Sequence, residues 1–151
     1  MNRISRGFLL FFIALTACIG IGQISCRSWS EISERTEKAV REVEILQKRI
    51  PIPERFVKER SEKTTRFGFV TFSDGYRTTD DCESVGGYYR RHFLGEGWDP
   101  KLMRDEEVGG GLRTRSFTFA NGEFSVVVEC QIDVLPEDDK IVGIVFKWRP
   151  K

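Results

Sequence analysis

The stretch Tyr89-Arg-Arg-His-Phe-Leu-Gly-Glu-Gly-Trp98 decides how the second half of the chain folds. Tyr89 and Phe93 are four residues apart, so they share one face of a helix. Gly95 or Gly97 can adopt the left-handed conformation that often follows the last turn of a helix, and Trp98 then begins a strand. The stretch therefore predicts a helix that docks onto a sheet and leads directly into it.

The predicted helix begins near Thr79 or Asp80. Glu83 follows Asp80 at the spacing of a capping box. The inward face of the helix consists of Cys82, Val85, Tyr89 and Phe93. In the middle of a helix, Gly86 and Gly87 each cost about 1 kcal/mol relative to alanine, so we infer that the backbone closely approaches the sheet there. A helix broken at the two glycines is the alternative.

The residues after this helix alternate between apolar and polar, as is typical of strands. Strands are predicted over residues 98–103, 113–120 and 141–148, with a loose connection over 104–112 and a turn over 136–139. Asn121-Gly122 is the strongest short signal for a hairpin and predicts a two-residue type I′ turn. The strand after this turn has one apolar face, formed by Phe124, Val126, Val128, Cys130 and Ile132.

The strand pattern before the helix is weaker. Residues 67–72 alternate and predict a strand, which ends where residues 73–75, Ser-Asp-Gly, have the composition of a turn. Residues 56–57 are expected to begin a short strand, whereas residues 58–65 are too polar to assign. Together, residues 51–151 are predicted to form an α+β domain in which an antiparallel sheet of four or more strands packs against one helix.

A helical stalk is predicted over residues 27–50. Its stripe of apolar or small residues recurs at helical spacing: Trp29, Ile32, Thr36, Ala39, Val43, Leu46 and Ile50. Ser28 and Glu31 form a capping box, and Pro51 ends the helix. Two interpretations remain. Either copies of residues 29–50 associate as a homo-oligomer beside a membrane, or the helix is an amphipathic linker that lies on its own domain or on the lipid surface.

The amino-terminal segment 1–26 is apolar. Residues 7–25 contain no charged side chain and follow Arg3 and Arg6. About twenty apolar residues span a hydrocarbon core of about 30 Å, so the segment predicts a single transmembrane anchor. The sequence Leu-Thr-Ala-Cys18 also resembles a bacterial lipobox, which predicts cleavage before Cys18 and lipidation of its sulfur. An uncleaved anchor, a lipoprotein signal and an ordinarily cleaved signal peptide remain as alternatives.

Charge also separates this segment from the rest of the chain. Arg3 and Arg6 are its only charged residues, so of 24 basic and 23 acidic side chains overall, 22 and 23 lie after residue 26. This balance lacks the basic excess that nucleic-acid binding requires. The two arginines favour a cytoplasmic amino terminus, although basic residues from Arg27 to Arg41 follow on the other flank. The folded part is expected on the periplasmic or extracellular face of the membrane.

The sequence contains few residues in a pattern that indicates a catalytic, metal-binding or phosphate-binding site. His92 is the only histidine, which excludes a metal site of several histidines and leaves a histidine-based triad without support. Glycines 109–111 lack the ending of a phosphate loop, and a flexible hairpin is the default interpretation, although together with Glu106 and Glu107 they would suit a mobile recognition loop. Three carboxylates, Asp105, Glu106 and Glu107, are the candidates for a hydrolase, although such clusters are usually solvated. Five arginines are candidates for an anion-binding patch: Arg90, Arg91, Arg104, Arg113 and Arg115.

Cys82 and Cys130 both point towards the predicted core. In an oxidising compartment they could form a disulfide that contributes on the order of 4 kcal/mol in the loop-entropy model. Two buried free thiols are the alternative. A Cα separation well above about 7 Å would exclude the bond.

The spacing Tyr89-x3-Phe93-x3-Gly97-Trp98, with an export segment and a proline-marked tether before it and several strands after it, resembles small bacterial membrane-anchored or lipoprotein domains of unknown function. The resemblance covers residues 76–148 and implies a tethered domain outside the cytoplasm, with no catalytic residues to carry over. The expected function is a non-enzymatic module, without cofactor or metal, that binds an unidentified protein or envelope partner. An oligomerising spacer and a small envelope hydrolase are the alternatives.

Overall fold

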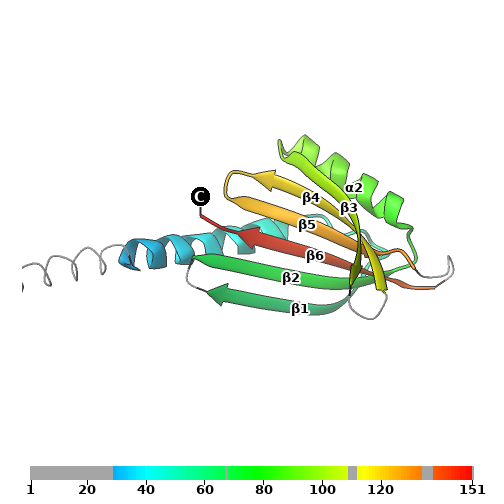
Figure 1. Cartoon of the computed structure of the whole chain (residues 1–151), viewed down its shortest axis with the longest axis horizontal. Coiled ribbons are helices and arrows are strands. Elements are labelled where there is room, and N and C mark those ends of the chain that lie inside the picture. Colours follow the sequence, from blue (N-terminus) through cyan, green and yellow to red (C-terminus); the bar gives the residue numbers. More distant parts are fainter. Residues whose placement is uncertain (1–28, 67, 109–111, 134–137, 151) are drawn as a thin grey trace, which may run out of the picture.

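A computed structural model describes residues 29–66, 68–108, 112–133 and 138–150. Residues 29–49 are helical and are called helix 29–49 below. The elements after it are β1 (Val57–Arg66), β2 (Phe69–Thr78), α2 (Cys82–Gly95), β3 (Asp99–Val108), β4 (Leu112–Asn121), β5 (Phe124–Gln131) and β6 (Lys140–Trp148) (Figure 1). The expectations for the anchor 1–26 and for Cys18 lie outside the described residues, as do those for glycines 109–111 and the first half of the turn 136–139.

The strands form one antiparallel sheet in the order β1-β2-β6-β5-β4-β3. The α+β class is therefore confirmed, with six strands where four or more were expected. The last strand, β6, lies between β2 and β5 and joins the β1–β2 hairpin to the β3–β4–β5 meander. Two helices, rather than one, pack on the buried face of this sheet.

The buried face carries a continuous layer of large side chains. One row of paired residues crosses four strands, and all of its members are buried: Phe72, Phe146, Val126 and Phe119. α2 adds Tyr89 and Phe93 to this layer, and helix 29–49 adds Ala39 and Val43. The ring of Phe93 stacks on that of Phe119 with centroids 4.6 Å apart. Burial of this apolar surface between the sheet and the two helices is the main stabilising contribution to the fold.

Helix 29–49 belongs to the same hydrophobic core as the sheet. Thr36, Ala39 and Val43, on the predicted stripe, are buried. The hydroxyl of Thr36 accepts a hydrogen bond from the backbone N–H of Gly68 at 3.2 Å, which ties the helix to the turn between β1 and β2. Trp29 is the exception, since it is 60% exposed. The helix therefore lies on its own domain, and the predicted boundary at residue 51 does not divide the folded unit.

The stretch 89–98 ends α2 with a Schellman motif. Gly97 has a φ of 77° and donates its N–H to the carbonyl of Leu94 at 3.1 Å, while Trp98 donates its N–H to the carbonyl of Phe93 at 2.9 Å. The rings of Trp98 and Phe93 pack edge to face with centroids 5.3 Å apart, which is the hydrophobic contact that accompanies this motif. Gly97 rather than Gly95 thus takes the left-handed conformation, and β3 begins directly after Trp98.

The start of α2 differs slightly from the prediction. Asp81, not Thr79 or Asp80, caps the helix, because its carboxylate accepts a hydrogen bond from the N–H of Ser84 at 2.8 Å. The inward-facing residues are those predicted, and the helix is continuous through its two central glycines.

The predicted turn at residues 73–75 is wrong, because these residues lie in the middle of β2. Gly75 pairs with Arg60, and a Cβ on Gly75 would lie only 2.7 Å from Cγ of Arg60. The unassigned polar residues 58–65 form most of β1, an edge strand whose side chains are all exposed. The chain instead reverses just before β2, where Gly68 has a φ of 70°.

Two predictions in the second half of the sheet also need correction. β3 extends to Val108, so much of the expected connection 104–112 is strand. Asn121 pairs with Phe124, which leaves Gly122 and Glu123 as the hairpin loop, and only Gly122 has a positive φ, of 62°. A type I′ turn needs positive φ at both loop residues, whereas glycine at the first loop position is typical of type II′.

Candidate functional site

A groove of about 300 Å³ lies between α2 and β3. Its first wall is one helical stripe of α2, formed by Glu83, Gly86, Gly87 and Arg90. Its second wall is residues 100–103 of β3, and its floor includes Phe117 and Phe119 of β4. We call this hollow the α2–β3 groove.

The two glycines of the α2–β3 groove have different roles. A Cβ on Gly86 would overlap the ring of Phe117, so the helix can approach the sheet closely only with glycine there, as predicted. A Cβ on Gly87 would meet only Nη1 of Arg91, at an ordinary contact distance of 3.6 Å. Packing therefore does not require Gly87, although glycine weakens a helix by about 1 kcal/mol relative to alanine. Its structural effect is to leave the groove open.

The β3 wall combines an irregular backbone with exposed apolar side chains. The register between β3 and β4 shifts between Pro100 and Leu102, and β-bulges of this kind are frequent beside binding sites. Leu102 is 48% exposed and Met103 is 62% exposed. β3 is also an edge strand of the sheet, so the outer side of its backbone pairs with no other described strand. A short apolar segment of edge strand thus borders the groove.

The rim of the α2–β3 groove is basic, because Arg90 and Lys101 line it and Glu83 is the one carboxylate in its lining. Glu83 forms an ion pair with Arg115. Arg115 also donates to both carboxylate oxygens of Asp105, at 2.7 and 2.8 Å. These hydrogen bonds raise the pKa of Arg115 and lower the pKa of Asp105. Arg90 and Arg91, by contrast, form no ion pair with any residue in the described part of the chain.

A second hollow, of about 520 Å³, lies between the end of helix 29–49 and strands β1 and β2. The carboxylate of Asp74 lines it, and the Asp74 side chain is only 4% exposed. Four donors from three elements surround this carboxylate: Gln47 Nε2 at 2.7 Å, Lys58 Nζ at 2.8 Å, Ser61 Oγ at 2.6 Å and Tyr76 OH at 3.3 Å. The cluster links the helix to both strands of the first hairpin.

The Asp74 cluster has a fixed charge state at neutral pH. Burial would raise the pKa of Asp74, but hydrogen bonds from Lys58, Ser61 and Gln47, together with the Lys58 charge, outweigh burial and lower that pKa. Burial and the adjacent carboxylate raise the pKa of Tyr76 to about 12. An ionised Asp74 with four engaged donors suits a structural link between elements better than it suits proton transfer.

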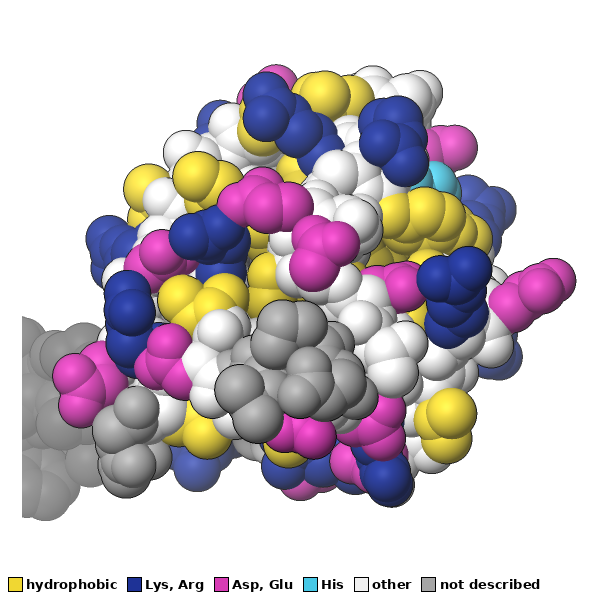
Figure 2. Space-filling model, turned by 90° about the vertical axis from the view of Figure 1, so that its right-hand side faces the viewer, with side chains coloured by type: hydrophobic (Ala, Val, Ile, Leu, Met, Phe, Trp, Pro, Cys, Tyr) yellow, Lys and Arg dark blue, Asp and Glu magenta, His cyan; other side chains and the backbone are white. Residues whose placement is uncertain are grey.

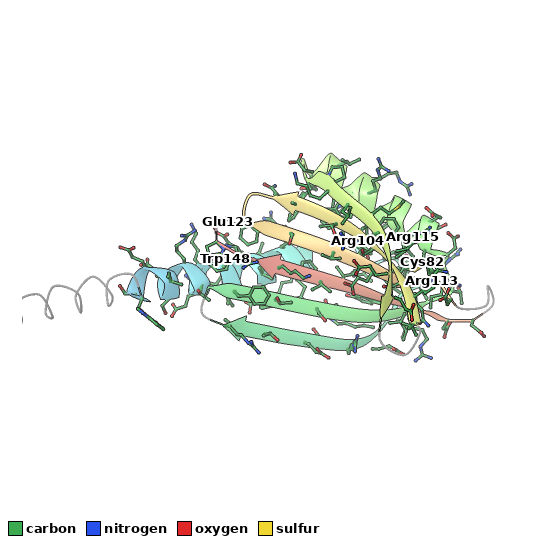
Figure 3. All side chains as sticks on the ribbon, in the orientation of Figure 1. Cys82, Arg104, Arg113, Arg115, Glu123 and Trp148 are labelled. Carbon is green, nitrogen blue, oxygen red and sulfur yellow. A yellow bond between two sulfur atoms is a disulfide. The ribbon has the colours of Figure 1, made fainter. Side chains whose placement is uncertain are left out.

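The five arginines expected to form an anion-binding patch do not act as one group. Three of them pair with carboxylates, as Arg115–Asp105, Arg104–Glu106 and Arg113–Asp133. Figure 3 labels these three arginines at one end of the sheet. Figure 2 shows basic and acidic side chains interspersed over this end of the molecule. Arg90 and Arg91 are the two members left without an ion pair within the described ranges, and both lie beside the α2–β3 groove.

The carboxylates considered for a hydrolase do not converge. Residues 105–107 are consecutive in β3, so their side chains alternate between the two faces of the strand. Asp105 is bound by Arg115, and Glu106 is bound by Arg104 at 2.7 Å. His92 lies in the last turn of α2, where its ring packs against the neighbouring phenylalanine. Across the residues that the structure describes, no three His, Cys, Asp or Glu side chains are placed to hold a metal ion.

A disulfide between Cys82 and Cys130 ties the first turn of α2 to β5. The two Cα atoms are 5.7 Å apart, a separation typical of disulfides. Glu83 follows Cys82 directly, and Gly86 lies one helical turn further on. The bond therefore fixes the end of α2 from which the groove wall extends.

The α2–β3 groove and the Asp74 cluster were not predicted as sites. The second glycine in mid-helix was a signal of an unusual position in α2, because glycine there is unfavourable, but it did not indicate a groove. Asp74 gave no such signal, since Ser-Asp-Gly between two alternating runs has the composition of a turn.

Comparison of the chain with protein-family models, curated proteins and solved structures found no match. Within the described ranges, neither helix is long and apolar enough to cross a membrane. A function has therefore to be inferred from the chemistry of the groove itself.

Proposed function

We propose that this protein is a membrane-anchored binding module, with its folded part outside the cytoplasm, and that it holds a partner protein in the α2–β3 groove. The observation that carries the proposal is the convergence of three features at one preformed hollow. These features are an apolar floor, a strand edge that no other described strand pairs with, and guanidinium groups that form no ion pair among the described residues. Binding sites are commonly apolar hollows with a few well-placed polar groups.

Gly87 strengthens this interpretation. Alanine would fit at position 87 without a clash, yet the chain has glycine there, which weakens the helix. Proteins commonly sacrifice stability at functional sites. An open groove is the benefit that offsets this loss at Gly87.

The proposed membrane anchor is supported by the sequence of residues 1–26, and the proposed location outside the cytoplasm is supported by the Cys82–Cys130 pair. Residues 1–26 combine two arginines with an apolar run, which is the layout of an export signal or anchor. Disulfides persist in oxidising compartments such as the periplasm and the cell exterior, and the Cys82–Cys130 bond fits such a location.

The two alternative functions have less support. Ala39 and Val43 would lie in the seam of an oligomerising stalk, but both are buried in the core of their own chain. The carboxylates of Asp105 and Glu106 would serve a hydrolase, but both are bound by arginines. Neither observation favours a role for these residues beyond the fold.

The anchor and the location can be tested by the intact mass of the protein extracted from its native membrane, with and without reduction before alkylation. We expect either the mass of the full chain or that of a chain beginning at an acylated Cys18, and alkylation of Cys82 and Cys130 only after reduction. A mass beginning elsewhere without acylation would contradict the anchor. Alkylation without prior reduction would contradict a location outside the cytoplasm.

The binding function can be tested by photo-crosslinking in intact cells. A benzoylphenylalanine at position 103 lies on the groove side of β3, because Met103 pairs with Phe117 of the groove floor. The same residue at position 57 is the matched control, because Val57 is 61% exposed and Met103 is 62% exposed. We expect one protein adduct, identified by mass spectrometry, at position 103 only, and its loss when Gly87→Leu fills the groove. Adducts that are equal at both positions, or that persist with Gly87→Leu, would contradict the proposal.

A further inference from the structure

The backbone of β3 makes one kind of partner the best match for the groove. An extended peptide segment can add to the edge of a sheet, where main-chain hydrogen bonds supply affinity and pockets for alternate side chains supply specificity. β3 provides such an edge, and the groove lies directly beside residues 100–103 of that strand.

Only a short part of this edge is open to a partner. From Arg104 to Glu107 the strand is charged at every position, which is a common protection of sheet edges against pairing. Leu102 and Met103 are apolar and exposed, and they adjoin the groove. Pro100 has no N–H and the register shift precedes Leu102, so an added segment would pair with β3 around Leu102 and Met103 and place an apolar side chain in the hollow over Phe117.

The charge of the groove rim selects for an acidic segment. Arg90 lines the groove, and Nη1 of Arg91 reaches the space beside Gly87. Both guanidinium groups lack a carboxylate partner among the described residues, whereas Glu83, the one carboxylate that lines the groove, is ion-paired with Arg115. Guanidinium groups bind carboxylates through paired, charge-assisted hydrogen bonds.

We propose that the partner presents an extended segment with alternating apolar side chains and at least one Asp or Glu, which adds to β3 as an extra strand and binds Arg90 and Arg91. This inference rests on the proposed binding function and specifies its partner. A fatty acid would satisfy the apolar floor and the arginines, but it would not use the unpaired backbone of β3.

The test is a selection from a random heptapeptide display library against the full-length chain in mild detergent. We expect enrichment of sequences that alternate apolar residues with Asp or Glu. Against the variant Arg90→Glu/Arg91→Glu, the enriched sequences should contain Lys or Arg instead. The matched control Arg149→Glu makes a comparable change at an exposed residue after β6, and the acidic sequences should persist there.

An enriched peptide then allows two measurements. Its affinity should fall by about tenfold or more with Arg90→Glu, which corresponds to the loss of one charge-assisted contact, and should change less than about twofold with Arg149→Glu. Hydrogen exchange at residues 99–103 should slow when the peptide binds to the unmodified chain. Slowing elsewhere, affinity that is insensitive to Arg90, or no enrichment would overturn the inference.

The outcome separates the inference from the proposed function. An adduct at position 103 that requires an open groove, together with a failed peptide selection, would keep the binding function and reject the extended acidic partner. Loss of both results would reject both proposals.

Discussion

At the scale of single residues, Asp74 shows how a buried carboxylate can be kept in a core. Its side chain points into the buried face of β2, where an unpaired charge would be strongly destabilising. Donors from helix 29–49, β1 and β2 compensate that cost. Three separate elements thus meet at one acceptor, and the register of the first hairpin is fixed at that point.

Replacing Asp74 with asparagine should lower the free energy of unfolding by about 1–3 kcal/mol, because the donors lose a charged acceptor at a buried position. Urea denaturation at pH 7 measures this change. The control Asp99→Asn alters a carboxylate that is 76% exposed and should change stability by no more than about 0.5 kcal/mol. Equal effects of the two substitutions would show that the cluster adds nothing to stability.

The same residue predicts a dependence on pH. The pKa of Asp74 is lowered in the folded protein, so the folded state binds a proton less readily than the unfolded chain. Its contribution is fully present above the unfolded carboxyl pKa of about 3.9 and is lost as the pH falls through the lowered folded pKa. Urea titrations between pH 6 and the acid limit of folding should lose stability less steeply in Asp74→Asn than in the unmodified protein.

At the scale of elements, α2 was predictable in its ends and its inward face because local chemistry determines both. The left-handed glycine, the Trp98–Phe93 contact and the spacing of Val85, Tyr89 and Phe93 are all local in sequence. The groove was not predictable, because it depends on how α2 sits over β3. That arrangement follows from tertiary contacts such as the one between Gly86 and Phe117.

Gly86 and Gly87 provide a matched pair of substitutions in one turn of α2. Gly86→Ala should destabilise the protein by about 1–3 kcal/mol, since its Cβ would overlap the Phe117 ring. Gly87→Ala should raise the free energy of unfolding by about 0.5–1 kcal/mol, since alanine is the better helix former and meets no obstacle. Thermal and urea unfolding of both variants measure the difference. Changes of the same sign would contradict the division of roles between the two glycines.

Helix 29–49 was predicted as a helix, but whether it packs on its own domain, on the lipid surface or against another copy was left open. Its stripe has the spacing of a coiled-coil seam, and a stripe that packs on a sheet has the same spacing. The pattern shows which residues are buried but not what covers them. Long-range contacts, such as that between Thr36 and Gly68, decide the question and have no local signal.

A pair of substitutions in helix 29–49 distinguishes core packing from a free stalk. Val43→Ala should lower the free energy of unfolding by about 1–3 kcal/mol, because Val43 is fully buried. Ile45→Ala removes a larger side chain from a position that is 51% exposed and should cost no more than about 0.5 kcal/mol. Unfolding curves that are unaffected by Val43→Ala would indicate that the helix does not pack on the sheet in solution.

At the scale of the whole molecule, the alternation of apolar and polar residues predicted the α+β class and most of the strands. It did not predict the full extent of the two edge strands. β1 has ten exposed residues and no apolar alternation, since both faces of this edge strand meet water. β3 was cut short for the same reason, because charged residues fill its second half. Sequence patterns record burial, so strands with little burial leave little pattern.

The disulfide is the covalent link between the helical layer and the sheet. It closes a loop with a sequence separation of 48 residues, so the variant Cys82→Ala/Cys130→Ala should lose on the order of 4 kcal/mol of stability in the loop-entropy model. Thermal unfolding with and without reductant measures this loss. Reductant should destabilise the unmodified protein and leave the variant unchanged. A reductant effect that is equal in both would mean that the bond does not form.

The position of β6 also sets the order of events during synthesis. The first hairpin and the later meander are joined in the sheet by this strand, which follows the other described strands in the sequence. Until residues 140–148 leave the ribosome, β2 and β5 lack the strand that joins them, so the described sheet stays in two parts. A chain whose sheet is unfinished can still be threaded through a translocation channel.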